Sequence, residues 1–283
     1  MKVFYHGDAD GECAAAILYN FNRAWVLSKE DFIEMQYEKP VPFEIISKDE
    51  DVYIVDFSFN QTDFEKLQTI TNNIVWIDHH ASCLKYPYTK EFGRSDWCNF
   101  HDKGPSGCEL TWMFMEYGKF PPSIVEMIGD YDSWRLQIPN SSALHIGLKL
   151  YDTHPTSKFW SNIFNGITNL DEIIIKGNAC NQYRDAYCKN LIKDFGFKTE
   201  ILGIKAFACN QYRFGSQGFG DLMNKYQVCI AFIFNGTEYV YSLYSTDPKI
   251  NCAEICQKFG GGGHKGAAGF HSKELVILRS EES

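Results

Sequence analysis

The chain has no excess of positive charge and no long apolar run, and we expect it to have no signal peptide. It carries 27 Lys and Arg against 36 Asp and Glu, a formal net charge of −9, which argues against a protein that coats duplex nucleic acid. A small phosphate-bearing substrate stays compatible with this balance, because bound metal ions would reverse the local charge. No apolar stretch approaches the length of a membrane span, and Met1-Lys2 leads directly into a predicted strand. We therefore expect a cytoplasmic protein without a membrane partner.

A Cys-x-x-Cys pair and a glycine-rich loop for nucleoside triphosphates are also missing. The ten cysteines are scattered and include no Cys-x-x-Cys pair, a distribution typical of buried, reduced thiols. The glycine-rich residues 260–270 lack the Walker spacing, so a loop that binds nucleoside triphosphates is not indicated.

The length and composition predict two packed domains. The chain has 283 residues, of which 45% are hydrophobic and 16% aromatic, enough for two hydrophobic cores. Strand-like and helical segments alternate at first, and the pattern becomes β-rich from about residue 199. We predict a first domain over residues 1–170, a linking helix over 171–197 and a smaller second domain over 198–283.

Three predicted strands end in carboxylate or imidazole side chains. These are His6, Asp8 and Asp10 after residues 2–5, Asp56 after 51–55, and Asp78, His79 and His80 after 74–77. With helical stretches between the strands, this pattern predicts a parallel α/β sheet with a site at its C-terminal edge. Neighbouring carboxylates repel each other and stay ionised at low cost only around a cation. Residues 19–39 are expected to continue the first helix and then become polar, and Phe43–Ile46 is predicted as a further strand.

Two later segments could add ligands. Asp130 and Asp132, at the end of a predicted helix, could complete a metal shell or could instead form an Asx turn with solvated aspartates. Around His264 and Lys265, glycines offer unshielded backbone N–H groups that suit an anionic oxygen. A flexible linker is the alternative for that segment.

Three other histidines are not assigned to the site. His101 and Asp102 could approach it, but we interpret them as a solvated loop pair. His145 and His154 have no motif around them, and we give them structural roles.

Taken in order, these motifs resemble those of the DHH phosphoesterase superfamily. The resemblance is carried by His6-x-Asp8-x-Asp10-Gly11, Asp56, Asp78-His79-His80 and the later Gly-Asp-Tyr-Asp. Gly261-Gly262-Gly263-His264, followed by Ala267-Ala268-Gly269, looks like the signature of the DHH-associated C-terminal substrate domain. The closest subgroups by motif are the nanoRNase and RecJ-like nucleases and the small-nucleotide phosphodiesterases. The resemblance implies a parallel-sheet DHH domain and a smaller α/β domain, with the active site in the cleft between them.

The resemblance also implies a set of site residues. Two divalent cations are expected, Mn²⁺ in preference to Mg²⁺, with His6 and Asp8 on one ion, Asp10, His79 and a fourth-motif aspartate on the other, and Asp56 bridging them. Asp132 is favoured over Asp130 as the fourth-motif ligand, and His6 could instead contact only substrate or a metal-bound water. His80 is expected to stabilise charge at the scissile phosphate and Asp78 to orient an imidazole or touch a metal. Substrate binding is expected from Gly261, Gly262, Gly263, His264 and Lys265.

The function that follows from the resemblance is a two-metal phosphodiesterase that degrades short single-stranded oligonucleotides to nucleoside monophosphates. Long duplexes are not expected as substrates, and a homodimer is a candidate assembly. The alternatives are a 3′-phosphoadenosine 5′-phosphate phosphatase, a cyclic or linear dinucleotide phosphodiesterase, or a catalytically idle nucleotide-binding protein.

Overall fold

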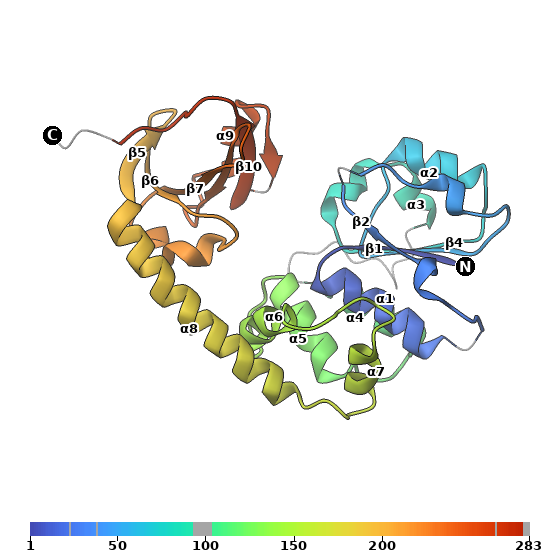
Figure 1. Ribbon diagram of the computed structural model, residues 1–283. Helices are drawn as coiled ribbons and strands as arrows, with labels where there is room; N and C mark the ends of the chain where they lie inside the picture. Colours follow the sequence, from blue (N-terminus) through green and yellow to red (C-terminus); the bar gives the residue numbers. More distant parts are fainter. Residues whose placement is uncertain (23, 38, 93–103, 264, 280–283) are drawn as a thin grey trace. The chain divides into compact units, whose positions relative to one another are not determined.

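The computed structural model describes the chain except for residues 23, 38, 93–103, 264 and 280–283. It divides into two compact units, Met1–Ala179 and Cys180–Ser283, drawn in Figure 1. The boundary falls inside the long helix α8 (Leu170–Phe195), which occupies most of the segment predicted as a linking helix. Among the described helices, none combines the length and apolar character that crossing a membrane would require.

The first unit is built on a four-stranded parallel sheet, as the sequence predicted. Its strands are β1 (Lys2–His6), β2 (Phe32–Met35), β3 (Val52–Val55) and β4 (Ile74–Ile77), in the order β2-β1-β3-β4. In the register of the sheet, Tyr5 lies beside Val55, and Val55 lies beside Ile77. The ends of β1, β3 and β4 therefore meet at one edge of the sheet.

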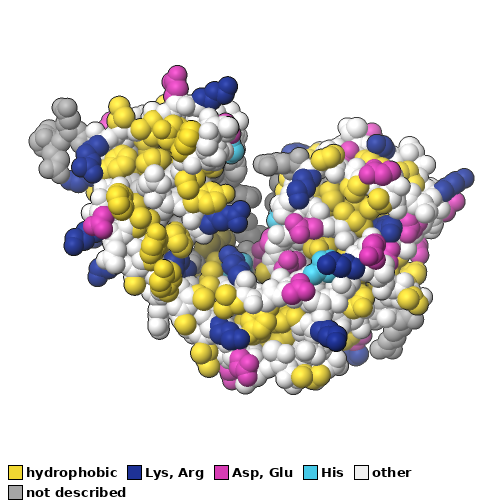
Figure 2. Space-filling model, viewed as in Figure 1, with side chains coloured by type: hydrophobic (Ala, Val, Ile, Leu, Met, Phe, Trp, Pro, Cys, Tyr) yellow, Lys and Arg dark blue, Asp and Glu magenta, His cyan; other side chains and the backbone are white. Residues whose placement is uncertain are grey.

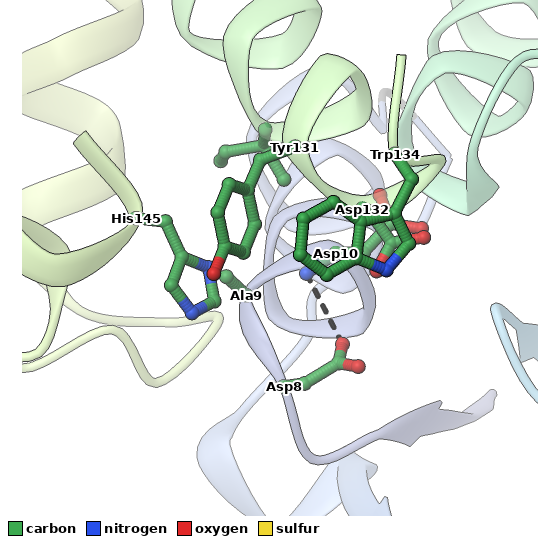
Figure 3. A pocket seen from close by; sticks show the side chains of 8 residues that line it. Asp8, Ala9, Asp10, Tyr131, Asp132, Trp134 and His145 are labelled. Atoms are coloured by element: carbon green, nitrogen blue, oxygen red, sulfur yellow. Dashed lines mark hydrogen bonds between the residues drawn. The ribbon is translucent and has the colours of Figure 1, made fainter. Parts of the chain in front are cut away.

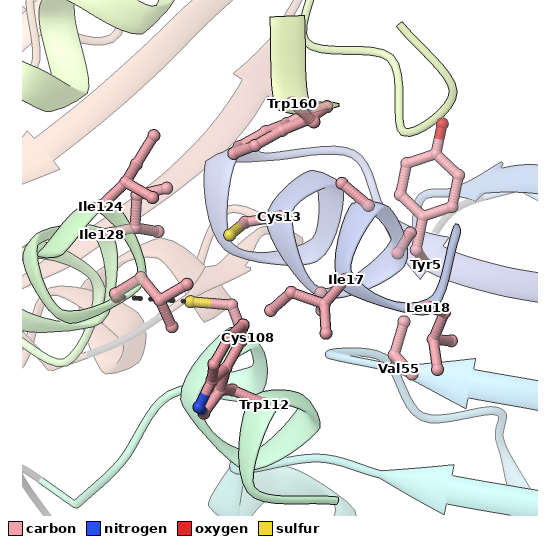
Figure 4. Close-up of a cluster of buried hydrophobic side chains, with 14 of the residues drawn as sticks. Tyr5, Cys13, Ile17, Leu18, Val55, Cys108, Trp112, Ile124, Ile128 and Trp160 are labelled. Atoms are coloured by element: carbon pink, nitrogen blue, oxygen red, sulfur yellow. Dashed lines mark hydrogen bonds between the residues drawn. The ribbon is translucent and has the colours of Figure 1, made fainter. Parts of the chain in front are cut away.

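Helices cover both faces of this sheet. Successive side chains of a strand point to opposite faces, and apolar side chains on each face pack against helices. Tyr5, Val55 and Ile77 pack into the cluster that contains α1 (Ala9–Phe21), α4 (Gly107–Met115) and α5 (Ser123–Asp132), and Figure 4 shows part of this cluster. Phe4, Ile54 and Trp76 pack on the other face, with α2 (Gln61–Gln68) and α3 (Tyr88–Phe92). Figure 1 shows the two helical layers on either side of the sheet.

The prediction of a strand at Phe43–Ile46 was wrong. Residues Phe43–Ile45 form a 3-10 helix, η2, directly after Pro42. The missing strand is β2, within the segment expected to continue the first helix and then become polar. β2 is an edge strand with a half-buried pattern, and Glu34 interrupts its apolar residues, so the usual signal of a buried parallel strand is weak there.

Smaller elements complete the first unit. They are η1 (Lys29–Asp31), η3 (Ala81–Lys85), α6 (Ser141–Leu148) and α7 (Lys158–Phe164).

The second unit is a six-stranded mixed sheet. Its strands are β5 (Phe197–Ile201), β6 (Ile204–Asn210), β7 (Val228–Phe234), β8 (Tyr239–Tyr244), β9 (Gly262–Gly263) and β10 (Ala267–Ser272), in the order β5-β6-β7-β8-β10-β9. β6 and β7 are parallel and the other neighbours antiparallel. Helix α9 (Cys252–Gln257) packs on one face of the sheet, and η4 (Ser216–Asn224) with the end of α8 packs on the other.

Candidate active site

The site lies at the C-terminal edge of the parallel sheet, within the first unit. His6 ends β1, Asp56 follows β3 and Asp78 follows β4. Among the described residues, three groups of His and Asp side chains bring ligand atoms within 4.8 Å of one another. They are His6, Asp8 and Asp56; Asp10, His79 and Asp132; and Asp56, His79 and His80.

The first group forms where β1 turns into α1. The Nδ1 atom of His6 lies 2.8 Å from Oδ2 of Asp8 and 3.9 Å from Oδ2 of Asp56. The other oxygen of Asp8 caps α1 by accepting hydrogen bonds from the N–H groups of Asp10 and Gly11 at 3.1 and 3.0 Å. A Cβ at Gly11 would lie 2.2 Å from the carbonyl oxygen of His6, so the tight turn requires glycine.

The second group surrounds Nε2 of His79. This atom lies 3.2 Å from Oδ1 of Asp56, 3.3 Å from Oδ2 of Asp132 and 3.7 Å from Oδ2 of Asp10. Asp56 therefore turns one carboxylate oxygen toward His6 and the other toward His79. Its backbone has a φ of 51°, a left-handed conformation that is uncommon for non-glycine residues and concentrates at functional sites.

The N-terminus of α4 holds Asp10 in place. Ser106 Oγ and the Cys108 N–H donate to Oδ1 of Asp10 at 2.7 and 3.0 Å, and the Gly107 N–H donates to Oδ2 at 2.7 Å. A helix N-terminus favours such a negative charge. No motif in the sequence connects this helix to a carboxylate about a hundred positions earlier.

The charges of the cluster fit a bound cation. Burial and the nearby Asp10 and Asp8 carboxylates raise the pKa of Asp56 and that of Asp132 well above their usual range. Both carboxylate oxygens of Asp56, His6 Nδ1 and His79 Nε2 are buried and have no hydrogen-bond partner among the described residues. Buried polar atoms are normally partnered, and oxygen and imidazole donors of this kind bind divalent cations such as Mn²⁺.

The two adjacent histidines differ in their electrostatics. Burial lowers the pKa of His79, which favours the neutral imidazole that a metal ligand requires. Burial also acts to lower the pKa of His80, but the contact of its Nδ1 with Oδ1 of Asp78 at 2.7 Å outweighs this effect and raises the pKa to about 9. Ser58 donates to the second oxygen of Asp78. Asp78 thus fixes the orientation of the His80 ring and stabilises its positive charge.

Asp130 and Asp132 point to different partners. Asp132 belongs to the group around His79, whereas the Asp130 carboxylate accepts from the N–H groups of Gln137 and Ile138 at 2.8 and 3.1 Å. Burial acts to raise the pKa of Asp130, but these donors outweigh it and the pKa lies below its usual value. Asp130 organises the turn after α5.

A pocket opens beside the cluster, as Figure 3 shows. It is lined by Asp8, Ala9, Asp10, Ile128, Tyr131, Asp132, Trp134 and His145. The ring of His145 stacks on Tyr131 with centroids 4.0 Å apart, and burial lowers the pKa of His145 to about 4. Sequence reasoning gave His145 only a structural role, because no motif surrounds it; the structure places it in the wall of this pocket.

The predicted substrate-binding segment lies in the second unit. Gly262 pairs with Gly269 and Gly263 with Ala268 between β9 and β10. A Cβ at Gly261 would lie 2.1 Å from the carbonyl oxygen of Gly269, so strand packing accounts for that glycine. The carbonyl oxygen of Lys265 accepts a hydrogen bond from the Cys252 N–H at 2.8 Å. His264 lies outside the described residues, as does the pair His101 and Asp102.

Comparison with known proteins identifies the first part of the chain. Residues 2–131 match the DHH family, N-terminal domain. Residues 2–131 therefore form a DHH-family N-terminal domain. The three groups of His and Asp side chains are consistent with a divalent-metal site of the kind typical of that family.

Individual relatives are distant. The uncharacterized protein R106 of Acanthamoeba polyphaga mimivirus is 24% identical over 294 residues, which cover 94% of this chain and 66% of that protein. A pGpG-specific phosphodiesterase, PggH from Vibrio cholerae, has a similar fold, with a TM-score of 0.56, 14% identity, and coverage of 95% of this chain and 92% of that structure. An exopolyphosphatase-related protein from Bacteroides fragilis aligns with a TM-score of 0.48 and 15% identity, over 96% of this chain and 86% of that structure.

Proposed function

We propose that the chain is a two-metal phosphodiesterase that degrades short single-stranded oligonucleotides, down to linear dinucleotides, to nucleoside monophosphates. The observation that carries this proposal is the placement of Asp56 between two groups of ligands. One of its oxygens faces the His6 group and the other the His79 group. Such a shared carboxylate is what a pair of neighbouring cations needs.

Each proposed ion has its own residues. His6 and Asp8 would hold one ion, Asp10, His79 and Asp132 would hold the other, and Asp56 would bind both. Mn²⁺ suits this mixture of carboxylate oxygens and imidazole nitrogens, and Mg²⁺ is the second candidate. When bound, a pair of such ions stabilises negative charge that develops on the oxygens of a phosphoryl group.

His80 would contact the phosphate directly, and Asp78 would act on it through His80. Because Nδ1 of His80 donates to Asp78, Nε2 is the ring nitrogen left to donate to a phosphate oxygen. A positively charged donor stabilises the extra charge of the transition state more than a neutral one does. Asp78 would hold that ring in position.

The glycine-rich segment would bind the part of the substrate away from the scissile bond. We assign this role to Gly261, Gly262, Gly263, His264 and Lys265. Backbone N–H groups and an ammonium are suited to a terminal phosphate. The net charge of −9 supports a short substrate rather than a long duplex, which would favour a basic surface. The surface agrees with this, because acidic and basic side chains are interspersed on the visible face of the first unit (Figure 2).

A linear dinucleotide as the preferred substrate is the second candidate. It is favoured by the fold shared with the pGpG-specific phosphodiesterase over 95% of this chain. Phosphatase activity on 3′-phosphoadenosine 5′-phosphate and hydrolysis of cyclic dinucleotides are further alternatives on the same metal site.

A product-resolved assay with Mn²⁺ tests the proposal. The substrates are a dinucleotide, a five-mer, a twenty-mer, a cyclic dinucleotide and 3′-phosphoadenosine 5′-phosphate, with His79→Ala as the inactive control. We expect stepwise release of monophosphates from the short linear substrates and none from the variant. A preference for the dinucleotide alone would support the second candidate. Binding of Mn²⁺ and nucleotide without any cleavage would refute the proposal and indicate a nucleotide-binding protein.

A further inference from the structure

Aromatic rings form one wall of the pocket beside the His and Asp cluster. Tyr131 lies between two other rings, with its centroid 4.0 Å from that of His145 and 5.8 Å from that of Trp134. Figure 3 shows this arrangement, and Asp10 and Asp132 line the same pocket. The Tyr131 and His145 rings are tilted by only 21°, and this stacking fixes the position of the Tyr131 ring.

Trp134 is exposed although it is large and apolar. Its exposed fraction is 57%, and it lines the pocket together with Asp132. A single exposed apolar residue needs no explanation by itself. Here, however, the ring lines the same pocket as Asp8, Asp10 and Asp132, which are ligands of the proposed ions.

The backbone holds Trp134 in an unusual conformation. Trp134 and Leu136 have φ angles of 49° and 51°, which are rare for bulky residues. The turn is nevertheless well fixed, because the Asp130 carbonyl oxygen accepts hydrogen bonds from the N–H groups of Arg135 and Leu136 at 3.0 and 3.2 Å. Arg135 also pairs with Glu109 of α4 at 2.8 Å. Strain that the surroundings maintain in this way concentrates at ligand-binding sites.

We propose that Trp134, backed by Tyr131 and His145, is a stacking platform for the nucleobase next to the scissile phosphate. This inference deepens the proposed function, because it assigns a base-binding residue to the same site. The cavity of about 180 Å³ is smaller than pockets that enclose a whole drug-sized ligand, about 300–1,000 Å³. It therefore suits one ring system rather than an entire nucleotide. Stacking on an aromatic ring tolerates any base, as degradation of mixed oligonucleotides requires.

The test compares two ligands that differ only by a base. Guanosine 5′-monophosphate and ribose 5-phosphate carry the same sugar and phosphate, and neither is turned over by a phosphodiesterase. Their Kd values are measured by calorimetry in the presence of Mn²⁺ for the full chain and for three variants: Trp134→Ala, Trp134→Phe and Phe120→Ala. Phe120 is the matched control, because it is 94% exposed and does not line the pocket.

We expect Trp134→Ala to weaken guanosine monophosphate binding by about 5- to 150-fold, the range corresponding to the stacking of one base. Ribose 5-phosphate binding should be unchanged, and Trp134→Phe and Phe120→Ala should bind both ligands nearly as the unaltered chain does. The proposal is overturned if Trp134→Ala weakens both ligands equally, if it affects neither, or if guanosine monophosphate does not bind at all. The proposed function fails on a different result, namely the absence of cleavage with Mn²⁺, so the two outcomes are distinguishable.

Discussion

A methyl group added at Gly107 would test whether the position of Asp56 controls activity. Gly107 begins α4 and donates its N–H to Asp10 at 2.7 Å. A Cβ built there would lie 2.5 Å from Cβ and 2.7 Å from Oδ1 of Asp56. Ordinary contacts start near 3.4 Å, so Asp56 and α4 would have to separate by roughly 1 Å, a displacement that can cost about 100-fold in rate.

We therefore expect Gly107→Ala to lower kcat on a dinucleotide by about 100-fold and to weaken Mn²⁺ binding. Its cost in the free energy of unfolding should be about 1–3 kcal/mol, as for other overpacked sites. The measurements are steady-state kinetics across a Mn²⁺ titration and urea unfolding of the same preparation.

Gly196→Ala is the matched control for this substitution. A Cβ at Gly196 would also meet atoms at 2.5 Å, the carbonyl oxygen of Ile192 and the ring of Phe207. These lie in the second unit. This variant should lose similar stability and keep its kcat. A Gly107→Ala protein with near wild-type kcat, or an equal loss of activity in the control, would refute the reasoning.

Three further results are expected. His79→Ala should lower kcat more than about 100-fold in a metal-supported assay, since even residues behind the ligands typically contribute 10- to 100-fold; retention of activity would exclude His79 as a ligand. Mn²⁺ at 100 times its Kd should raise the free energy of unfolding by about 2.7 kcal/mol, which corresponds to about 5–10 °C in Tm, and EDTA should reverse this effect. A Tm that changes with neither Mn²⁺ nor EDTA would count against the metal site. Asp130→Asn should lower the free energy of unfolding by about 1–3 kcal/mol, because it weakens two hydrogen bonds from backbone N–H groups. It should also weaken nucleotide binding through Trp134 and leave the Mn²⁺ affinity within a few-fold. A large loss of Mn²⁺ affinity in calorimetry would contradict the role assigned to Asp130.

The parallel sheet and the clustering of ligands at its edge could be predicted because both depend on local signals. The apolar runs before His6, Asp56 and Asp78 identify the strands. Because the C-terminal ends of parallel strands lie at one edge of the sheet, the residues that follow these strands lie close together. The edge strand β2 was missed because it lacks such a continuous apolar run. Among the described strands β2 lies at the edge of its sheet, and its Glu34 is exposed to solvent, so a charged residue interrupts the apolar run.

The features that the sequence did not reveal are long-range contacts. Nothing near Ser106 or Gly107 in the chain indicates that their donors bind Asp10. Likewise, Trp134 and His145 lie eleven positions apart on different elements, and only the packing of Tyr131 against His145 places them in one pocket. Such contacts depend on how α4, α5 and α6 pack, which no short motif encodes.

Asp130 and Asp132 show how closely spaced residues acquire different roles. The two carboxylates are separated by one residue in the last turn of α5, so their local sequence signals are almost the same. Asp132 faces the imidazole of His79, while Asp130 faces the turn that carries Trp134. If one aspartate supplies a metal ligand and the other fixes a stacking ring, a single short segment positions both the phosphate and the base of a nucleotide. In that case the Gly-Asp-Tyr-Asp segment would couple nucleotide binding to the proposed metal site, and Asp130 would contribute without contacting an ion.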